Sequence, residues 1–429
     1  MRLAATAGSA ADMNEMLSAA VAGYRPRVAL PARPKAAARL SAQSAALPGA
    51  SLAVYDSLAA VEPLWRAFES GADCSVFQNF DYLAAWQRHI GTRERVTPAI
   101  VVIEHGEKIL AIVPLARVAG SLLRRLTWLG QNPSDYLGPL LARDRVPAIP
   151  PDVFHALWNE IRALLQSDPR FRHDLIDLRK MPATVGEQKN PFAALPVLPH
   201  PSDAYVATLT GDWDSFYNER RSAKARRQDR SKSKRLAELG AVRMLTPDRR
   251  REIARAVETL FAQKAVNFAR KGIANRFCDP GYREFYHDLA LNPRTRNLAH
   301  VSELQVGDAP AAINFGFEYR GRYSLCLVSY DEEFSRFSPG AIHLNELFRR
   351  AIERGLREFD FLVGFQRLKR EWSDRHTPLF DHLSGATVRG SLAALVLLSY
   401  VRLKRLIKTT PALWNAYLQL RALKGRSEK

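Results

Sequence analysis

The segment at residues 329–372 constrains the fold more than any other part of the chain. An apolar run ends near Tyr330, and a Ser-Pro-Gly turn follows it. The next stretch has apolar residues at helical spacing, and a second apolar run occupies residues 359–363. This change of period predicts a strand, a helix and a strand in succession, a unit typical of α/β proteins. The apolar helix positions are Leu344, Leu347, Phe348 and Ala351.

The turn before this helix has the composition of an anion-binding helix start. Ser338 can cap the first amides, Pro339 suits the first helical position, and Gly340 lets a ligand approach the backbone. Amides at such a start bind phosphate groups, for example the pyrophosphate arm of a thioester carrier. The same residues are also common at the start of helices that bind no ligand. The pattern therefore leaves open whether this turn binds an anion or only begins the helix. His343, one turn into the helix, can face a bound acyl group or be structural.

The order of these residues resembles the GNAT-like acyltransferases of the CelD cellulose-biosynthesis type, which are distant relatives of the Fem peptidyltransferases. The resemblance covers about residues 52–385 and is weaker upstream, where it is carried by residues 77–78, Trp86, 112–115 and 129–137. The matching positions of the specific segment are Tyr330, Asp331, Phe334, Ser338, Pro339, Gly340, Gly355, Phe359, Asp360, Phe361, Leu362, Gly364, Lys369 and Trp372.

The resemblance implies a mixed α/β (α+β) fold with two tandem GNAT-like modules, each a mixed sheet flanked by helices, and a helical C-terminal tail. It implies an N-acyltransferase that uses acetyl-CoA or another acyl-CoA as co-substrate and no metal. We assign the pyrophosphate cradle to Ser338, Gly340 and Ala341. An amine would attack the thioester carbonyl directly, so the protein must orient two substrates, remove a proton and stabilise the oxyanion.

Three positions are expected to carry the chemistry. Lys369 would supply electrostatic stabilisation, with Asp331 or Asp360 as the base or as the partner of the lysine. The family usually has an acidic residue near Gln366 and a tyrosine where this chain has Leu368, and neither replacement can transfer a proton. Another residue therefore does this work, or the activity is weak or absent. Substrate contacts are expected at Tyr330, Gln366 and Trp372.

The formal charge of +19 on 429 residues is local. The excess of basic residues lies in 1–50, 219–235 and 389–429, and the rest of the chain is neutral. This distribution argues against duplex DNA and for separate contacts with anionic ligands or surfaces. Three widely spaced cysteines offer no zinc or dithiol spacing, and there is no P-loop, Gly-x-Ser-x-Gly or His-Glu-x-x-His motif.

We expect four parts. Residues 1–50 are Ala- and Pro-rich, which indicates a disordered leader with Met1 or Met13 as the start, and 191–201 reads as a Pro-rich linker. Residues 51–203 form the first module and 204–388 the catalytic module, which begins with a basic helix at 219–239. This helix can dock an anionic ligand or be a solvated face. The tail at 389–429 is basic and amphipathic, which favours peripheral contact with an anionic membrane over packing on the body.

These features favour a cytoplasmic enzyme, with peripheral attachment to the inner membrane, that acylates an amino sugar or lipid-linked precursor of an exopolysaccharide or adhesin. The pathway comes from the resemblance, because one fold hosts many substrates. Two alternatives remain open. One is an aminoacyl-tRNA-dependent Fem-like transferase. The other is a catalytically degenerate regulator that binds an anionic nucleotide such as cyclic di-GMP.

Overall fold

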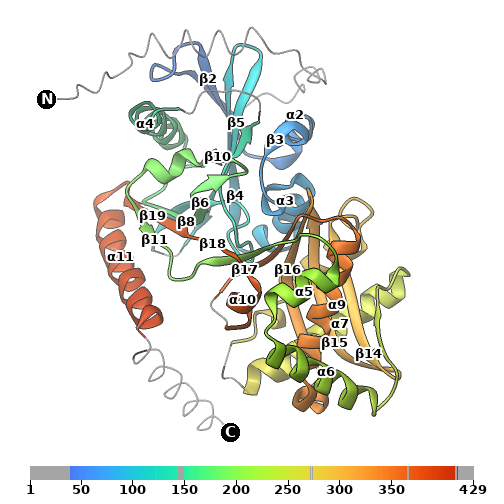
Figure 1. Ribbon diagram of the computed structural model, residues 1–429. Helices are drawn as coiled ribbons and strands as arrows, with labels where there is room; N and C mark the ends of the chain where they lie inside the picture. Colours follow the sequence, from blue (N-terminus) through green and yellow to red (C-terminus); the bar gives the residue numbers. More distant parts are fainter. Residues whose placement is uncertain are drawn as a thin grey trace, which may run out of the picture. The chain divides into compact units, whose positions relative to one another are not determined.

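The computed structural model describes residues 39–120, 122–143, 149–270, 272, 274–364, 367–410 and 413. They divide into two compact units (Figure 1). Of the described residues, those from 39 to 200 and 379–401 form the first unit, and 201–378 and those from 402 form the second. Each unit has its own large sheet with helices against it, so the mixed α/β class predicted from the sequence is confirmed.

The sheet of the first unit has ten strands in the order β1-β2-β4-β5-β6-β8-β19-β11, with β7 joined to β5 and β3. The long β4 and β5 are almost wholly buried, as their apolar runs require, and β6 and β8 are parallel. A separate pair is formed by β9 and β10. The strands are β1 (Leu40–Gln43), β2 (Ala50–Tyr55), β3 (Ala72–Asp73), β4 (Val96–His105), β5 (Lys108–Ala119), β6 (Arg124–Trp128), β7 (Leu140–Ala142), β8 (Leu175–Pro182), β9 (Thr184–Val185), β10 (Gln188–Lys189), β11 (Val197–Pro199) and β19 (Leu379–Gly385).

An aromatic cluster packs a helix of the first unit against its sheet. The buried side of α4 repeats at helical spacing, and its Phe154 and Trp158 contact Phe192 at ring distances of 5.0 and 5.3 Å. Trp128 reaches the same ring at 4.9 Å. The helices are α2 (Leu58–Gly71), α3 (Phe80–Trp86) and α4 (Pro151–Ser167), with short turns η1 (Val76–Gln78), η2 (Gln87–Gly91) and η3 (Pro191–Ala194).

The structure corrects three boundaries predicted from the sequence. Residues 40–43, assigned to the leader, pair with β2, and the next turn is held by hydrogen bonds to the Glu160 carboxylate. Residues 191–201, assigned to a linker, contain the buried Phe192 and β11. Residues 379–385, assigned to the second module, form β19 between β8 and β11. In each case tertiary partners order a segment whose local composition is not that of a typical strand.

The sheet of the second unit has seven strands in the order β13-β14-β15-β16-β17-β12-β18. All neighbours are antiparallel except β16 and β17, which are parallel and joined through α9. The predicted strand–helix–strand unit is therefore confirmed. The strands are β12 (Ala204–Thr208), β13 (Val242–Leu245), β14 (Ala299–Val306), β15 (Ala309–Tyr319), β16 (Arg322–Tyr330), β17 (Glu358–Val363) and β18 (Arg375–Thr377).

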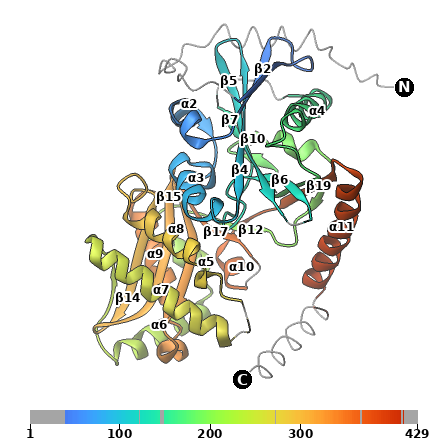
Figure 2. The ribbon, with the colours of Figure 1, turned by 180° about the vertical axis from the view of Figure 1, so that it is seen from behind.

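Helices cover both faces of this sheet: α5, α6 and α9 lie on one face, and α7 and α8 on the other (Figures 1 and 2). Beneath α9, Phe348 stacks on Phe359 at 4.1 Å and on Trp372 at 4.6 Å. These rings fix α9 over β17. The helices are α5 (Trp213–Arg220), α6 (Ala223–Ala237), α7 (Arg250–Arg270), α8 (Pro280–Leu291), α9 (Pro339–Glu353) and α10 (Arg367–Trp372), with η4 (Arg276–Cys278) and η5 (Glu332–Phe337).

The predicted tail helix is present as α11 (Val388–Thr409). In the part of the chain that the structure describes, no helix combines the length and apolarity needed to span a bilayer. Most of the predicted tail beyond residue 410 lies outside the described residues.

Candidate functional site

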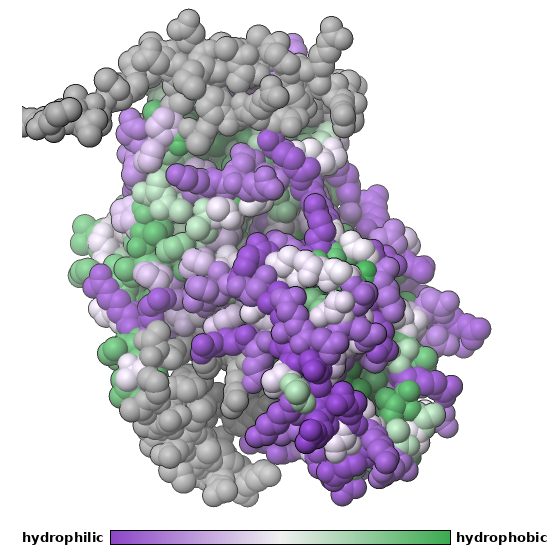
Figure 3. All heavy atoms as spheres, viewed as in Figure 1, coloured by the Kyte–Doolittle hydropathy of each residue, from purple (hydrophilic) through white to green (hydrophobic). Residues whose placement is uncertain are grey.

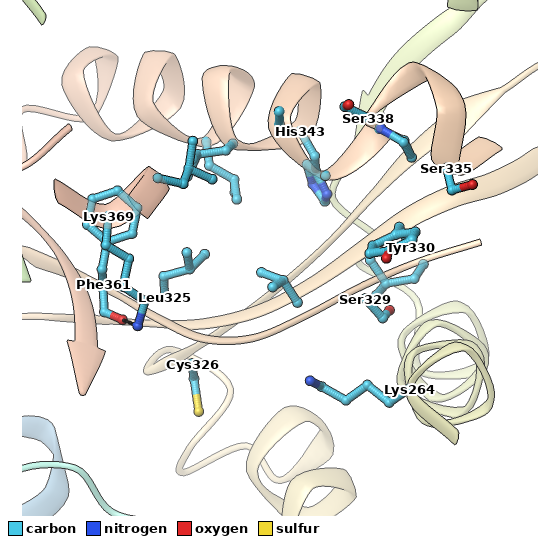
Figure 4. Close-up of a pocket in the computed structure, with 18 of the residues that line it drawn as sticks. Lys264, Leu325, Cys326, Ser329, Tyr330, Ser335, Ser338, His343, Phe361 and Lys369 are labelled. Atoms are coloured by element: carbon cyan, nitrogen blue, oxygen red, sulfur yellow. Dashed lines mark hydrogen bonds between the residues drawn. The ribbon is translucent and has the colours of Figure 1, made fainter. Parts of the chain in front are cut away.

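A cavity opens where two parallel strands of the second unit separate. β16 and β17 pair from Arg322 and Glu358 to Ser324 and Asp360, but both strands continue beyond that point. A cavity of about 520 Å³ lies between the diverging strands and the start of α9 (Figure 4). Beyond that point the two strands no longer pair with each other, so a ligand can lie between them.

An irregularity in β16 places a side chain at this cavity. Phe315 of β15 pairs with Leu327 and Gly316 with Leu325, so Cys326 is an extra residue in β16. Such a bulge bends the strand and re-aims its side chains. Cys326 lines the cavity, and sequence patterns carried no signal for this bulge.

The predicted cradle residues Ser338, Gly340 and Ala341 all line the cavity. The capping role predicted for Ser338 is wrong: its backbone is left-handed, with φ 56° and ψ 53°, and its side chain does not cap α9. Its hydroxyl instead accepts a hydrogen bond from Lys232 Nζ at 3.1 Å. Pro339 is the first helical residue, as predicted.

The backbone at Gly340 faces open space. A Cβ at this position would meet no atom within 4 Å, and among the described residues its amide has no acceptor. The Ala341 amide, in contrast, donates to the Ser338 carbonyl at 2.9 Å. The open part of the predicted cradle is therefore centred on Gly340, with the Lys232 ammonium held beside it by Ser338.

Lys369 lies at the other end of the cavity (Figure 4). Its Nζ donates to the carbonyls of Phe361 at 2.7 Å, Val363 at 3.3 Å and Leu362 at 3.4 Å. Leu362 has a left-handed φ of 59°, and its amide donates to the Asp360 carboxylate at 2.8 Å. The end of β17 is thus held in an unusual conformation by one carboxylate and one ammonium group.

The structure places the two predicted acidic residues away from the described cavity wall. Asp360 is fully buried, accepts the Leu362 amide and pairs with Arg322 at 3.3 Å. Asp331 caps η5 by accepting the Glu333 amide at 3.0 Å. Both carboxylates therefore have structural partners.

The three predicted substrate contacts have different positions. Tyr330 lines the cavity. Trp372 is 1% exposed and stacks between aromatic rings of the core, so it is not on the described cavity wall. Gln366 lies outside the described residues.

His343 enters the cavity wall from α9, as one of its two sequence interpretations allowed (Figure 4). Burial lowers the pKa of this imidazole to about 3, so the ring is neutral at neutral pH. Its Nε2 shares a hydrogen bond of 2.9 Å with the Ser302 hydroxyl. This bond leaves Nδ1 as the ring nitrogen that can meet a ligand.

From Ser302, a network of buried polar side chains continues across the sheet. The Asn314 amide donates to the Tyr323 hydroxyl at 2.6 Å, and this hydroxyl contacts His300 Nδ1 at 2.9 Å. Gly316 gives Tyr323 its space, since a Cβ there would lie 2.5 Å from the hydroxyl oxygen. Sequence reasoning missed this network of side chains. Its members come from three strands, and the register of these strands cannot be inferred from the local sequence.

Basic side chains surround the start of α9. Helix α6, the predicted basic helix, supplies Lys232, and its Arg235 lies over the ring of Phe337 at 5.5 Å. Lys264 of α7 also lines the cavity and lies 5.0 Å from the centre of the Phe268 ring. Figure 3 shows a strongly hydrophilic surface over α5 and α6. No cluster of three metal-ligating side chains occurs within the described ranges.

Residues 223–370 match a family model described as an acetyltransferase (GNAT) domain. This range contains β13 to β17 and α9, and therefore the cavity walls and Lys369. This match supports an acyltransferase whose residues 223–370 are similar to a GNAT domain. GNAT domains generally bind an acyl-CoA and an acceptor.

No curated protein matches the chain. Among solved structures, FemX is 10% identical with a TM-score of 0.49, over 70% of this chain and 91% of its own. L-PGS from Bacillus licheniformis is 13% identical with a score of 0.45, over 79% and 96%. A tandem GNAT protein from the clavulanic acid biosynthesis pathway is 12% identical with a score of 0.42, over 75% and 93%. Nothing about activity follows from scores at this level.

Proposed function

We propose that the second unit transfers an acyl group, most simply acetyl, from an acyl-CoA to an amine. The observation that carries this proposal is the cavity between the separated strands, with the open Gly340 backbone at one end and Lys369 at the other. The pyrophosphate would lie at Gly340, where the start of α9 and Lys232 both favour an anion. The acyl arm would then extend between the diverging strands β16 and β17.

The proposed reaction is one substitution at the thioester carbonyl. The amine nitrogen forms a bond to the carbonyl carbon, the carbon–sulfur bond breaks, and the amine proton passes to the departing sulfur. Asp331 and Asp360 are engaged elsewhere, which is why we move the proton-accepting role to His343 Nδ1. With its low pKa, His343 would hold the proton only transiently and deliver it to the sulfur.

For the acceptor, we propose an amino sugar or lipid-linked precursor in exopolysaccharide synthesis at the inner face of the cytoplasmic membrane. This finer assignment rests on the resemblance to the CelD type and on the basic segments at 219–239 and 389–429. An amine on a phosphate-linked precursor would suit a cavity beside so many cations.

A non-catalytic regulator that binds an anionic nucleotide is the second candidate. One observation favours it: the described part of the cavity wall contains no carboxylate. The same basic surface at Lys232 and Lys264 would then bind a nucleotide such as cyclic di-GMP without turnover.

Calorimetric titration separates these candidates. The full chain is titrated with acetyl-CoA, with longer acyl-CoAs and with cyclic di-GMP. We expect saturable heat with an acyl-CoA and its loss in Gly340→Trp, because an indole there would fill the open space. Gly71→Trp is the matched control, since a Cβ at Gly71 also meets no atom within 4 Å but lies in the first unit. Heat with cyclic di-GMP and none with any acyl-CoA would replace the transferase by the regulator.

A further inference from the structure

Helix α11 has one buried apolar side and one exposed apolar side. Ala394 and Val401, which lie in the part of α11 that belongs to the first unit, are almost fully buried. The start of the helix is fixed by Arg389, which pairs with the Asp174 carboxylate at 2.9 Å. Gly390 is required at this contact, because a Cβ would lie 1.6 Å from the Asp174 carbonyl oxygen. Residues 388–401 are therefore held in a defined orientation.

The opposite side of α11 carries an exposed apolar stripe. At about 100° per residue, the stripe residues fall within an arc of about 100°, centred on the side of the helix that faces away from Ala394 and Val401. Each of them is between 54% and 82% exposed, although leucine and valine are usually buried. Figure 3 shows apolar residues at the surface along the side where Figure 1 draws α11. The stripe residues are Val388, Leu392, Leu395, Val396, Leu403 and Leu406.

The charges near the stripe select the partner. Arg402 borders it, and Lys404 and Arg405 lie further round on either side. Glu428 is the one acidic residue of the sequence from 389 to 429, against nine basic residues. A second copy of the chain docked on this stripe would bring like charges together. An anionic bilayer instead complements the cations and takes up the apolar side chains.

We propose that α11 is an interfacial membrane helix: the stripe inserts among the headgroups of an anionic bilayer while the opposite side stays packed on the first unit. The helix has 22 residues, about 33 Å in length, and lies in the plane of the surface. This proposal does not depend on the transferase, since none of its residues lines the cavity.

The test is cosedimentation of the full chain with vesicles of phosphatidylcholine, with and without phosphatidylglycerol. We expect binding only when phosphatidylglycerol is present, and weaker binding in high salt. Leu392→Glu combined with Leu395→Glu should abolish it. Leu122→Glu is the matched control, because Leu122 is equally apolar and 82% exposed but lies outside α11. Replacing Arg402 and Lys404 by Gln should weaken binding about 25-fold, at about fivefold per charge.

Light scattering without vesicles completes the test. The proposal predicts a single mass for the wild-type chain and for the Leu392→Glu, Leu395→Glu double variant, with unchanged circular dichroism because the altered side chains are exposed. The proposal would be overturned if the wild-type chain bound equally well to vesicles that contain only phosphatidylcholine. It would also be overturned if the double change Leu392→Glu and Leu395→Glu left binding unchanged. An oligomer that the same two changes dissolve would also overturn it and assign the stripe to a second copy.

Discussion

His343 is the residue at which the burial of the cavity wall has a measurable thermodynamic effect. Its pKa falls to about 3 in the folded chain because the ring is desolvated, whereas an unfolded histidine titrates near 6.5. Below pH 6.5 the unfolded state therefore binds a proton that the folded state does not. The contribution to stability is complete above pH 6.5 and is lost progressively as the pH falls towards 3.

We predict that His343→Gln makes the second unit less sensitive to acid. Between pH 7 and pH 5 the wild-type chain should lose about 2 kcal/mol more stability than the variant, because the variant has no imidazole to protonate at this position. Urea unfolding at the two pH values measures this difference. His376→Gln is the control, because His376 is exposed. A wild-type pH dependence that His343→Gln leaves unchanged would contradict a neutral, buried His343.

Among the elements, the junction between η5 and α9 stores strain beside the cavity. Ser338 has a left-handed backbone, which is unfavourable for any residue with a Cβ and costs about 1 kcal/mol or more. The conformation brings its hydroxyl to Lys232 and leaves Gly340 open. The left-handed backbone of Ser338 thus produces both the strain and the open geometry of the proposed anion site.

We predict that Ser338→Gly is more stable than Ser338→Ala by about 1 kcal/mol, since glycine accepts the left-handed backbone and alanine does not. Both variants lose the hydrogen bond from Lys232, so acyl-CoA affinity should fall by the same factor in each. Thermal unfolding and calorimetric titration of the pair separate backbone strain from the hydroxyl contact. Equal stability of the two variants would mean that this turn is not strained.

The elements differ in how far the sequence determines them. Apolar runs were sufficient to predict β16 and β17, and helical spacing was sufficient for α9, which buries one face. The family resemblance selected Gly340, Ala341, Tyr330 and Lys369, and all four line the cavity. The positions of Trp372 and Asp360 could not be predicted, because a strand or helix residue acquires its neighbours through register and packing. From the sequence, His343 could be recognised only as a histidine near the start of the helix. Its hydrogen bond to Ser302 could not be predicted, because that contact depends on how the helix packs against the sheet.

At the scale of the whole molecule, the chain returns to its first unit after completing the second. β18 ends at Thr377, and β19 begins two residues later between β8 and β11. β19 joins β11 to the rest of the first sheet, and residues 388–401 of α11 belong to the same unit. A strand supplied from so far along the sequence makes folding of the first unit depend on the last 50 residues or so.

We predict that a chain ending at Pro378 loses the cooperative unfolding of the first unit, because β8 and β11 are left with unpaired edges. The second unit should keep its own transition, since all seven of its strands remain. A chain ending at Thr387 is the matched control: it retains β19 and lacks all of α11, so the first unit should unfold cooperatively at a lower temperature. Calorimetry and hydrogen exchange of the three chains measure these transitions. If the chain ending at Pro378 kept both transitions, β19 would be an accessory strand, and the first sheet would be stable without it.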